Sequence, residues 1–220
     1  MFISNQLPNH SFIDFFGKEA DEWVFYGSHF NYRERYPASD AVFKPDDASE
    51  AKFSNRASLV NAYDNSIRST DRFLHDVITL LDRTEAVSAM LYTSDHDENI
   101  FDDGRRLFLH ASPVPSIYEL YVPFIIWTSD TYRRNYAQEA NTLLINRHKS
   151  VTNSESAFHT MLGLAGIETP VRNDSLSVAS RKFRPSDRMY LDDHDEPVPV
   201  NKILRDKQDF VLMKKIEAGK

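Results

Sequence analysis

The clearest candidate for chemistry in this sequence lies where an apolar run ends in a group of polar side chains. The run covers residues 89–92, and Ser94, Asp95 and His96 follow it almost at once. A buried strand that ends in polar residues is how an α/β enzyme presents reactive groups at the edge of its sheet. A carboxylate oxygen and an imidazole nitrogen make up half of a tetrahedral zinc site, or part of a site for a harder cation. Asp95 and His96 are therefore candidate metal ligands.

These two candidate ligands are adjacent in the chain, which restricts the backbone that they require. Successive side chains of a strand point to opposite faces, so both reach one point only if the chain turns right after Ser94. Ser, Asp and Asn residues dominate the stretch that follows and favour such a turn. The same composition is also typical of a solvated, capped loop that binds nothing. The residues alone leave both interpretations open.

Histidines follow two other apolar runs. His29 comes after the aromatic run at residues 23–26 and a glycine that permits a sharp turn, and His110 comes directly after residues 107–109. His29 thus marks a second strand end that carries a histidine. Position alone assigns no role to either side chain.

The segment that follows His29 is rich in tyrosine and arginine. Arginine donates paired hydrogen bonds to phosphate or carboxylate oxygens, so Arg33, Arg35 and Tyr36 are candidates for an anion-binding loop. A plain solvated loop explains the same residues, and this alternative also stays open.

Composition limits the class of function. The chain has 220 residues and a net charge of −7, and it has no dense stripe of Lys and Arg, so no nucleic acid is expected as a partner. Because cysteine is absent, any metal must be held by His, Asp, Glu or hydroxyl groups. No apolar stretch approaches the roughly 18 to 20 residues of a spanning helix, so the chain as given is expected to be soluble.

The hydrophobic pattern predicts an α/β fold with a mostly parallel sheet flanked by helices. Apolar residues recur at three and four spacings over residues 55–84 and predict a long helix, which leads into the strand at 89–92. A second buried strand is predicted at 124–127. Residues 152–155 match a capping box that begins another helix, and residues 188–200 match two short strands about a polar turn. Residues 1–180 are expected to form one domain, and residues 181–220 a hairpin and charged tail.

Taken together, several strings resemble the carboxyl-terminal half of the lipid A phosphoethanolamine transferases, within the sulfatase and alkaline-phosphatase superfamily. They occur in the family's order over roughly residues 1–204, which makes the set far more specific than any one of them. The strings are Phe2-Ile3-Ser4-Asn5-Gln6, Tyr26-Gly27-Ser28-His29 with Arg35-Tyr36-Pro37, Asn61-Ala62-Tyr63-Asp64-Asn65-Ser66-Ile67, Ser94-Asp95-His96-Asp97-Glu98, and Phe158-His159-Thr160-Met161-Leu162-Gly163-Leu164.

The resemblance implies a metal-dependent transfer of phosphoethanolamine from a phospholipid head-group donor to a lipid A-like acceptor, through a threonine that is transiently phosphorylated. Asp95 and His96 match the family's metal pair, with zinc the usual ion and another divalent metal as the alternative. His29 and His110 match histidines around the transferred phosphoryl group or a second metal. The family's catalytic domains face the periplasm at the inner membrane, and the same place is expected for the parent enzyme of this chain.

The sequence departs from the family pattern in three respects. Asp97 and Ala111 stand where the family usually has glycine, and Asp97 adds a negative charge beside the metal pair. The family's nucleophilic threonine and a glutamate ligand come from a part of the domain that precedes these strings, and no Thr here has a matching context. The fold is thus expected to be incomplete at its amino end, and the isolated chain to be inactive.

Two other functions are compatible with the same residues. One is a non-catalytic module that keeps the fold to bind a phosphorylated lipid or sugar, with His29 and the loop of Tyr32, Arg33 and Arg35 as the anion site. The other is a sulfatase or phosphodiesterase that acts on a soluble ester. In either case the missing amino-terminal part of the domain, or a second copy of the chain, is an expected partner, because an interrupted sheet exposes an edge.

Overall fold

The computed structural model describes residues 27–110, 114–191, 194 and 196–218. The chain divides into two compact units, Met1–Asp76 and Val77–Lys220. The predicted strand at residues 23–26 and the string at Phe2-Ile3-Ser4-Asn5-Gln6 lie outside the described residues. Within those residues, no helix combines the length and the hydrophobicity that a membrane crossing requires.

The first unit is built from three 3-10 helices, η1 (Tyr32–Arg35), η2 (Ala38–Asp40) and η3 (Phe53–Asn55), and from the first part of helix α1 (Arg56–Arg83). Its core consists of Tyr32, Leu59 and Ala62, all of them buried. The ring of Tyr32 meets the ring of Tyr63 edge to face, with 5.2 Å between the centroids. The loop after His29 is therefore attached to α1 through aromatic packing.

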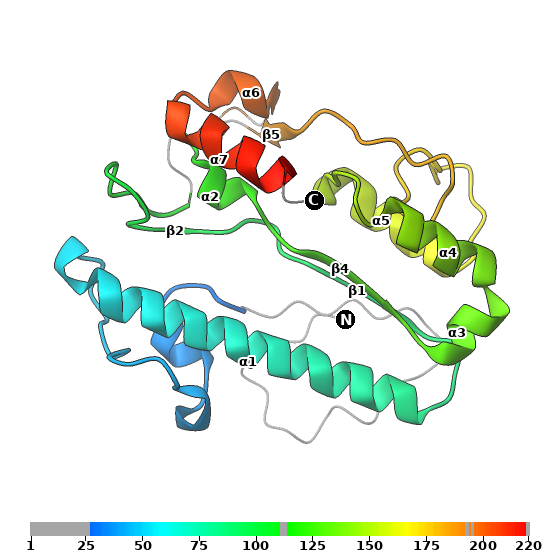
Figure 1. The fold of residues 1–220 in the computed structure, drawn as a ribbon, viewed down its shortest axis with the longest axis horizontal. Coiled ribbons are helices and arrows are strands. Elements are labelled where there is room, and N and C mark those ends of the chain that lie inside the picture. Colours follow the sequence, from blue (N-terminus) through cyan, green and yellow to red (C-terminus); the bar gives the residue numbers. More distant parts are fainter. Residues whose placement is uncertain (1–26, 111–113, 192–193, 195, 219–220) are drawn as a thin grey trace. The chain divides into compact units, whose positions relative to one another are not determined.

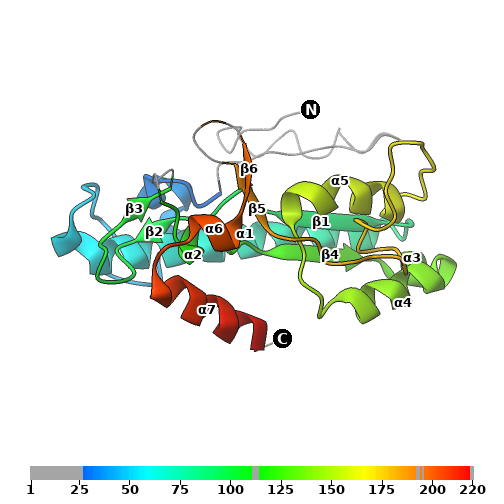
Figure 2. The ribbon, with the colours of Figure 1, turned by 90° about the horizontal axis from the view of Figure 1, so that it is seen from above.

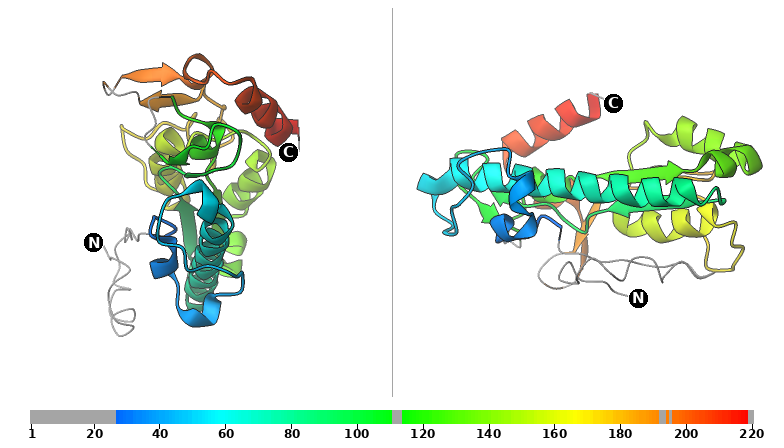
Figure 3. Two further views of the ribbon diagram at one scale, coloured as in Figure 1. Left: turned by 90° about the vertical axis from the view of Figure 1, so that its left-hand side faces the viewer. Right: turned by 90° about the horizontal axis from the view of Figure 1, so that it is seen from below.

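Helix α1 confirms the long helix that the sequence predicts, with bounds one residue inside the expected ones. Figure 3 shows it as one unbroken helix. Its buried positions recur at three and four spacings, which is the pattern of a helix that covers one face of a core.

The second unit contains three pairs of strands, each of them antiparallel among the described residues. Strand β1 (Ala89–Thr93) pairs with β4 (Phe124–Thr128), β2 (Asn99–Ile100) with β3 (Phe108–Leu109), and β5 (Met189–Leu191) with β6 (Pro197–Pro199). In Figure 1, β1 and β4 run side by side as a long ribbon. The strands predicted at 89–92 and 124–127 and the hairpin near the carboxyl end are confirmed.

The predicted mostly parallel order is not confirmed by these strand pairs. A parallel pair needs a crossover connection, usually a helix, that returns the chain to the same end of the sheet. Between β1 and β4 the chain instead forms the small β2–β3 hairpin and the four-residue helix α2 (Ile117–Leu120). It therefore re-enters β4 from the end at which it left β1.

Among the described residues, five further helices form most of the rest of the second unit. They are α3 (Asp130–Asn135), α4 (Ala137–Asn146), α5 (Asn153–Leu164), α6 (Val200–Ile203) and α7 (Lys207–Ala218). Helix α5 contacts β1, and Tyr132, Leu164 and Ala179 form a buried cluster against which Ile126 packs. The domain boundary after residue 180 stays a prediction.

The capping box was predicted at the wrong helix. Helix α5 begins at Asn153 as expected, but the Thr152 side chain makes no capping hydrogen bond there. The box is found at α2, where Ser116 and Glu119 cap each other's backbone. The Asn153 side chain instead donates to the carbonyl of Ser94, at 2.6 Å, and so connects the first residue of α5 to the chain just after β1.

An ion-pair cluster attaches α7 to the rest of the second unit, and Figure 2 shows α7 beside α2. Arg105 donates to both oxygens of Asp209, at 2.7 and 2.8 Å, and also to Asp103. The backbone N–H of Ile117 donates to the same Asp209, which is fully buried. Asp209 therefore joins the first turn of α7 to the first turn of α2.

Candidate metal and phosphoryl site

Strand β1 ends at Thr93, and the next residues form the turn that Asp95 and His96 require. The Ser94 hydroxyl donates to the carbonyl of His96 at 2.7 Å, and the backbone N–H of His96 donates to Asp95 Oδ1 at 3.0 Å. These hydrogen bonds curl the chain, so that the two adjacent side chains lie on the same side of it. Asp95 Oδ2 is 3.8 Å from His96 Nε2.

The hydrogen bond at the other ring nitrogen of His96 determines which nitrogen can bind a cation. His96 Nδ1 lies 3.1 Å from the carbonyl oxygen of Asp97. Because a carbonyl only accepts, Nδ1 carries the proton, and the lone pair is left on Nε2. This arrangement, with one ring nitrogen bound to a carbonyl and the other open, is typical of histidines that ligate metals.

Asp95 and His96 fit a metal ion as a pair of donors. Two ligands about 2 Å from a tetrahedral ion lie roughly 3.3 Å apart, so the 3.8 Å between Asp95 Oδ2 and His96 Nε2 needs only a small adjustment. The Asp95 side chain is 86% exposed and can move. In the part of the chain that the structure describes, no set of three His, Cys, Asp or Glu side chains has the arrangement of a metal site.

His110 joins this pair through the β2–β3 hairpin. In that hairpin Asn99 is paired with Leu109, so the residues just outside the pair, Glu98 and His110, face each other. His110 Nδ1 is 3.5 Å from Glu98 Oε1. The rings of His96 and His110 lie against each other, with 3.8 Å between centroids and 36° between planes. The structure thus brings together Asp95, His96 and His110, which the sequence separates by up to fifteen residues.

The side chains of Glu98 and His110 differ in the fraction that is exposed to solvent. The Glu98 side chain is 5% exposed, whereas that of His110 is 32% exposed. The carboxylate therefore lies on the more buried, Nδ1 side of the imidazole, as a close contact at 3.5 Å. This leaves Nε2 of His110 for contacts away from Glu98.

A buried polar network supports this cluster, and sequence reasoning missed it. Asn99 donates to Glu119 Oε1 at 2.6 Å and to the carbonyl of Leu109 at 2.8 Å, and the Ser116 hydroxyl donates to Asn99 at 2.5 Å. The backbone N–H of Asp97 donates to the carbonyl of Glu119 at 2.9 Å. The network therefore fixes both strands of the hairpin and the loop that carries His96. The Ser116-x-x-Glu119 spacing was the available signal, because it matches a capping box.

Asp97, which stands where the family usually has glycine, needs no left-handed backbone. Positive φ among described non-glycine residues occurs at Glu85, Phe101, Arg106 and Leu109, and not at Asp97. Its carboxylate accepts from the backbone N–H of Glu98 at 2.8 Å. Burial, and to a lesser degree the charge of Asp97, raises the pKa of Tyr92. The backbone therefore accommodates Asp97, and the negative charge of this residue acts on a side chain close to the candidate ligands in sequence. Ala111 lies outside the described residues.

The other predicted site residues lie together in the first unit, where most of their polar groups are used to fold the loop. Arg35 donates to the carbonyls of His29 and Phe30, at 2.8 and 3.2 Å. Arg33 lies over the ring of Tyr36, 4.9 Å from its centroid, and donates to the Tyr36 carbonyl. His29 is exposed, and its Nδ1 is 2.6 Å from the Phe30 carbonyl oxygen.

Tyr36 is the most deeply placed of these candidates. It is 5% exposed, and its hydroxyl donates to Asp46 at 2.8 Å. Burial raises the pKa of Tyr36 to about 12, and the neighbouring Asp46 adds to this effect. The roles of Arg33, Arg35 and Tyr36 in substrate binding stay predictions.

Fold and sequence together define the class of this protein. The sequence profile of the sulfatase family matches residues 23–167, and the chain belongs to this family. Kdo(2)-lipid A phosphoethanolamine 7''-transferase from Escherichia coli K12 is 32% identical over 155 residues, which cover 66% of this chain and 26% of the relative. Phosphoethanolamine transferase EptA from Helicobacter pylori is 29% identical over 142 residues, 63% of this chain and 26% of the relative.

Solved structures agree with these relatives. The C-terminal periplasmic domain of EptC from Escherichia coli, in complex with Zn, superposes with a TM-score of 0.68 at 19% identity, over 85% of this chain and 53% of that one. The soluble domain of lipooligosaccharide phosphoethanolamine transferase A from Neisseria meningitidis gives a TM-score of 0.64 at 27% identity, over 76% and 53%. The predicted resemblance to the carboxyl-terminal half of such a transferase, and its sulfatase-like fold, are confirmed. The chain spans about a quarter of the length of the curated relatives and about half of these solved domains.

Proposed function

We propose that this chain is part of a phosphoethanolamine transferase that acts on lipid A or a related lipid sugar, and that Asp95 and His96 supply two ligands of its metal ion, zinc. The observation that carries the proposal is the geometry after β1. There, Asp95 Oδ2 faces His96 Nε2 at 3.8 Å, and the opposite ring nitrogen, Nδ1, lies 3.1 Å from the backbone carbonyl oxygen of Asp97. The relatives support the class of reaction, since they are named as phosphoethanolamine transferases.

In this proposal the bound metal ion lowers the pKa of a hydroxyl nucleophile and neutralises charge on phosphoryl oxygens. His110 acts beside it. Glu98 lies 3.5 Å from its Nδ1, which leaves Nε2 toward the phosphoryl group; in the imidazolium form, Nε2 would donate a hydrogen bond to a phosphoryl oxygen or give a proton to the leaving oxygen. By resemblance, His29 is assigned to the transferred phosphoryl group or a second metal, and Arg33, Arg35 and Tyr36 are assigned to substrate binding.

The proposal requires residues that this sequence does not supply in a matching context. Two donors are too few for a zinc site, which takes four ligands in structural sites and three protein ligands in catalytic ones. The glutamate ligand and the nucleophilic threonine would come from the amino-terminal part of the same domain. That part would also extend the two-stranded ribbon into the larger, mostly parallel sheet that the sequence predicts. The whole enzyme would take a phospholipid head-group donor at the periplasmic face of the inner membrane.

Zinc titration by calorimetry tests the two-ligand assignment. The chain is expected to bind about one zinc ion weakly, because two ligands give only part of the affinity of a full set. The Asp95→Ala/His96→Ala variant should lose this binding. The chain offers a matched control in His75 and Asp76, an adjacent and exposed His–Asp pair on α1 whose side chains are 3.4 Å apart. The His75→Ala/Asp76→Ala variant should bind zinc as the parent chain does.

Two outcomes would count against the assignment. Equal loss in both variants would show that zinc binds to surface histidines in general. If the parent chain bound no zinc but did bind phosphorylated head groups, the chain would be the non-catalytic module instead.

A further inference from the structure

A basic surface lies on the second unit, away from the residues assigned to the metal site. It consists of the end of α4 with the turn after it, and of the segment that follows residue 180. Segments 141–150 and 180–186 contain five Lys or Arg residues and no Asp or Glu, in a chain whose net charge is −7. The basic surface is defined by Leu144, Ile145, Arg147, His148, Lys149, Arg181, Lys182 and Arg184.

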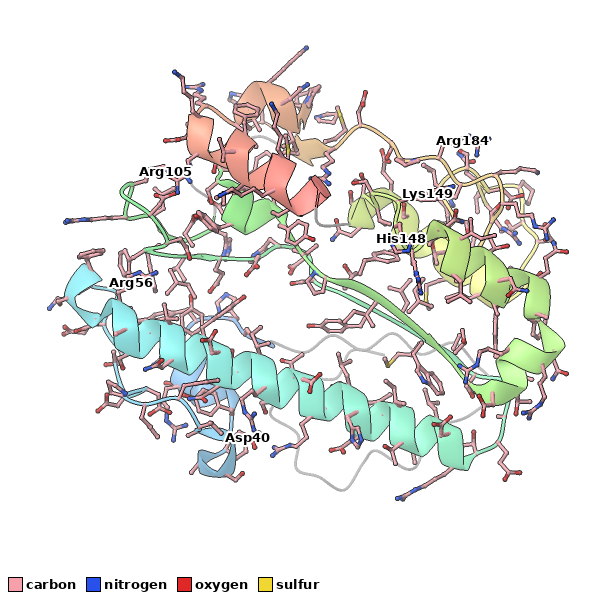
Figure 4. All side chains as sticks on the ribbon, viewed as in Figure 1. Asp40, Arg56, Arg105, His148, Lys149 and Arg184 are labelled. Carbon is pink, nitrogen blue, oxygen red and sulfur yellow. The ribbon has the colours of Figure 1, made fainter. Side chains whose placement is uncertain are left out.

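Hydrogen bonds hold the two segments of the basic surface together. The Asn146 side chain is buried and donates to the carbonyls of Val178 and Ser180, at 2.9 and 3.0 Å. Lys149 and Arg184 both donate to the carbonyl of Phe183, at 3.3 and 3.1 Å. In Figure 4, His148, Lys149 and Arg184 lie in one region of the second unit. The positive charges are therefore concentrated in space as well as in sequence.

Most of these charges form no ion pair with a carboxylate in the part of the chain that the structure describes. Arg147, Arg181 and Arg184 are exposed. Lys182 is the member that pairs with an acidic side chain, Asp174, at 3.2 Å. Such a surface attracts anions in spite of the overall negative charge of the chain.

Two aliphatic side chains project beside the charges. Leu144 is 59% exposed and Ile145 is 67% exposed, while the opposite side of α4 is anchored by buried Thr142 and Asn146. The charges come from residues that follow α4 and from the segment after residue 180. Exposed aliphatic residues beside Lys and Arg are typical of segments that lie at a membrane surface. The apolar residues enter the head-group boundary and the cations contact lipid phosphates.

We propose that the basic surface docks on an anionic phospholipid bilayer. Several separated cations suit the phosphates of neighbouring lipids, and two aliphatic residues are too few for the apolar core of a stable protein interface. The inference uses none of the metal-site residues and does not require the proposed transferase activity. It gives the domain a defined face toward the lipid.

Vesicle sedimentation with the full chain tests this docking. The chain should bind vesicles in which about one third of the lipid is phosphatidylglycerol and not vesicles of phosphatidylcholine alone, and binding should fall as salt is raised. Each basic residue at such a surface contributes about fivefold to affinity, so Arg147→Glu/Arg181→Glu should weaken binding by at least about twentyfold. Leu144→Ser/Ile145→Ser should weaken it by a smaller factor. The control is Arg68→Glu/Arg83→Glu, which makes the same charge change at two exposed positions of α1.

Three results would overturn the proposal. They are equal losses in the basic-surface and control variants, equal binding to both kinds of vesicle, and self-association of the parent chain that the Leu144→Ser/Ile145→Ser variant abolishes. The last result would assign the surface to a contact between copies. Vesicle binding should persist in the Asp95→Ala/His96→Ala variant, so failure of the metal assignment and failure of this proposal are distinguishable.

Discussion

The loop after His29 and the loop after β1 use similar residue types for different purposes. In the first, Arg33, Arg35 and Tyr36 direct their polar groups to backbone carbonyls and to Asp46. In the second, local backbone groups take one side of the His96 ring, and the other side is left facing Asp95. Candidate ligands are therefore recognised less by their residue types than by the atoms that remain available after the loop has folded.

The supporting polar groups differ in the same way. Asn65, fully buried on α1, donates directly to the hydroxyl of Tyr36, one of the first set of candidates, at 3.3 Å. In the second unit the support is one step removed, because Asn99, Ser116 and Glu119 hold the backbone and not the candidate side chains. Substitutions should then affect stability in the first loop, and ligand binding in the second.

The largest expected effect concerns an ion pair in the second unit that lies outside the metal cluster. Arg105→Ala leaves Asp209 fully buried without its cation, and removing one partner of a buried pair costs about 3 to 5 kcal/mol. Urea unfolding should show this loss. Zinc affinity, measured where the variant is still folded, should stay within a few-fold of the parent chain. A larger drop in affinity would mean that α7 supports the cluster directly.

The pH dependence of the same variant sharpens this result. Hydrogen bonds from Arg105 hold the pKa of Asp103 below its usual value of 3.8, so the pair stabilises the fold above about pH 4 and loses this contribution as the pH falls through the lowered pKa. The parent chain should therefore lose more stability than Arg105→Ala between neutral pH and pH 3. Parallel losses in the two proteins would contradict the lowered pKa of Asp103.

A smaller loss is expected in the first unit from Asn65→Ala. Asn65 Oδ1 accepts from the backbone N–H groups of Val42 and Phe43, and its amide donates to the Phe43 carbonyl at 2.9 Å. Removing it leaves these groups without their partner, at a cost of about 2 to 3 kcal/mol in the free energy of unfolding. Urea unfolding measures this cost, and calorimetry should find zinc binding unchanged. If a folded Asn65→Ala variant lost zinc binding, the support of the first loop would affect ligand binding as well as stability, and the stated difference between the two loops would be wrong.

Sequence reasoning found the elements whose pattern is local, and missed contacts that depend on pairing. The periodicity of residues 55–84 was enough for α1, and the apolar runs for β1 and β4, because a helix face or a buried strand repeats within a few residues. The direction of strand pairing has no such local signal, so the antiparallel ribbon was not foreseen.

The candidate site shows the same division. Asp95 and His96 could be selected because they follow a strand end directly. The contact between Glu98 and His110 depends on the register of a hairpin with only two residues in each strand. The Asp103-Gly104 turn pointed to a reversal of the chain there, but not to its register. The contact of Glu98 with His110 was therefore missed, although Glu98 lies two residues from His96.

The smallest expected change in stability tests the role of Glu98. Glu98→Leu removes one partner of a contact between a buried carboxylate and a partly exposed imidazole. Removing one partner costs about 1 to 3 kcal/mol, and because the His110 side chain is 32% exposed and can contact water, the loss in the free energy of unfolding should be near the lower limit, about 1 kcal/mol. The ring of His110 should nevertheless lose the carboxylate that faces its Nδ1. Nitrogen NMR of the imidazole is expected to show the proton fixed on Nδ1 in the parent chain and shared between the two nitrogens in the variant. His75, exposed on α1, is the internal control and should not change. If His110 gave the same spectrum in both proteins, Glu98 would be a packing residue, and the orientation of His110 would come from its contact with the ring of His96 alone.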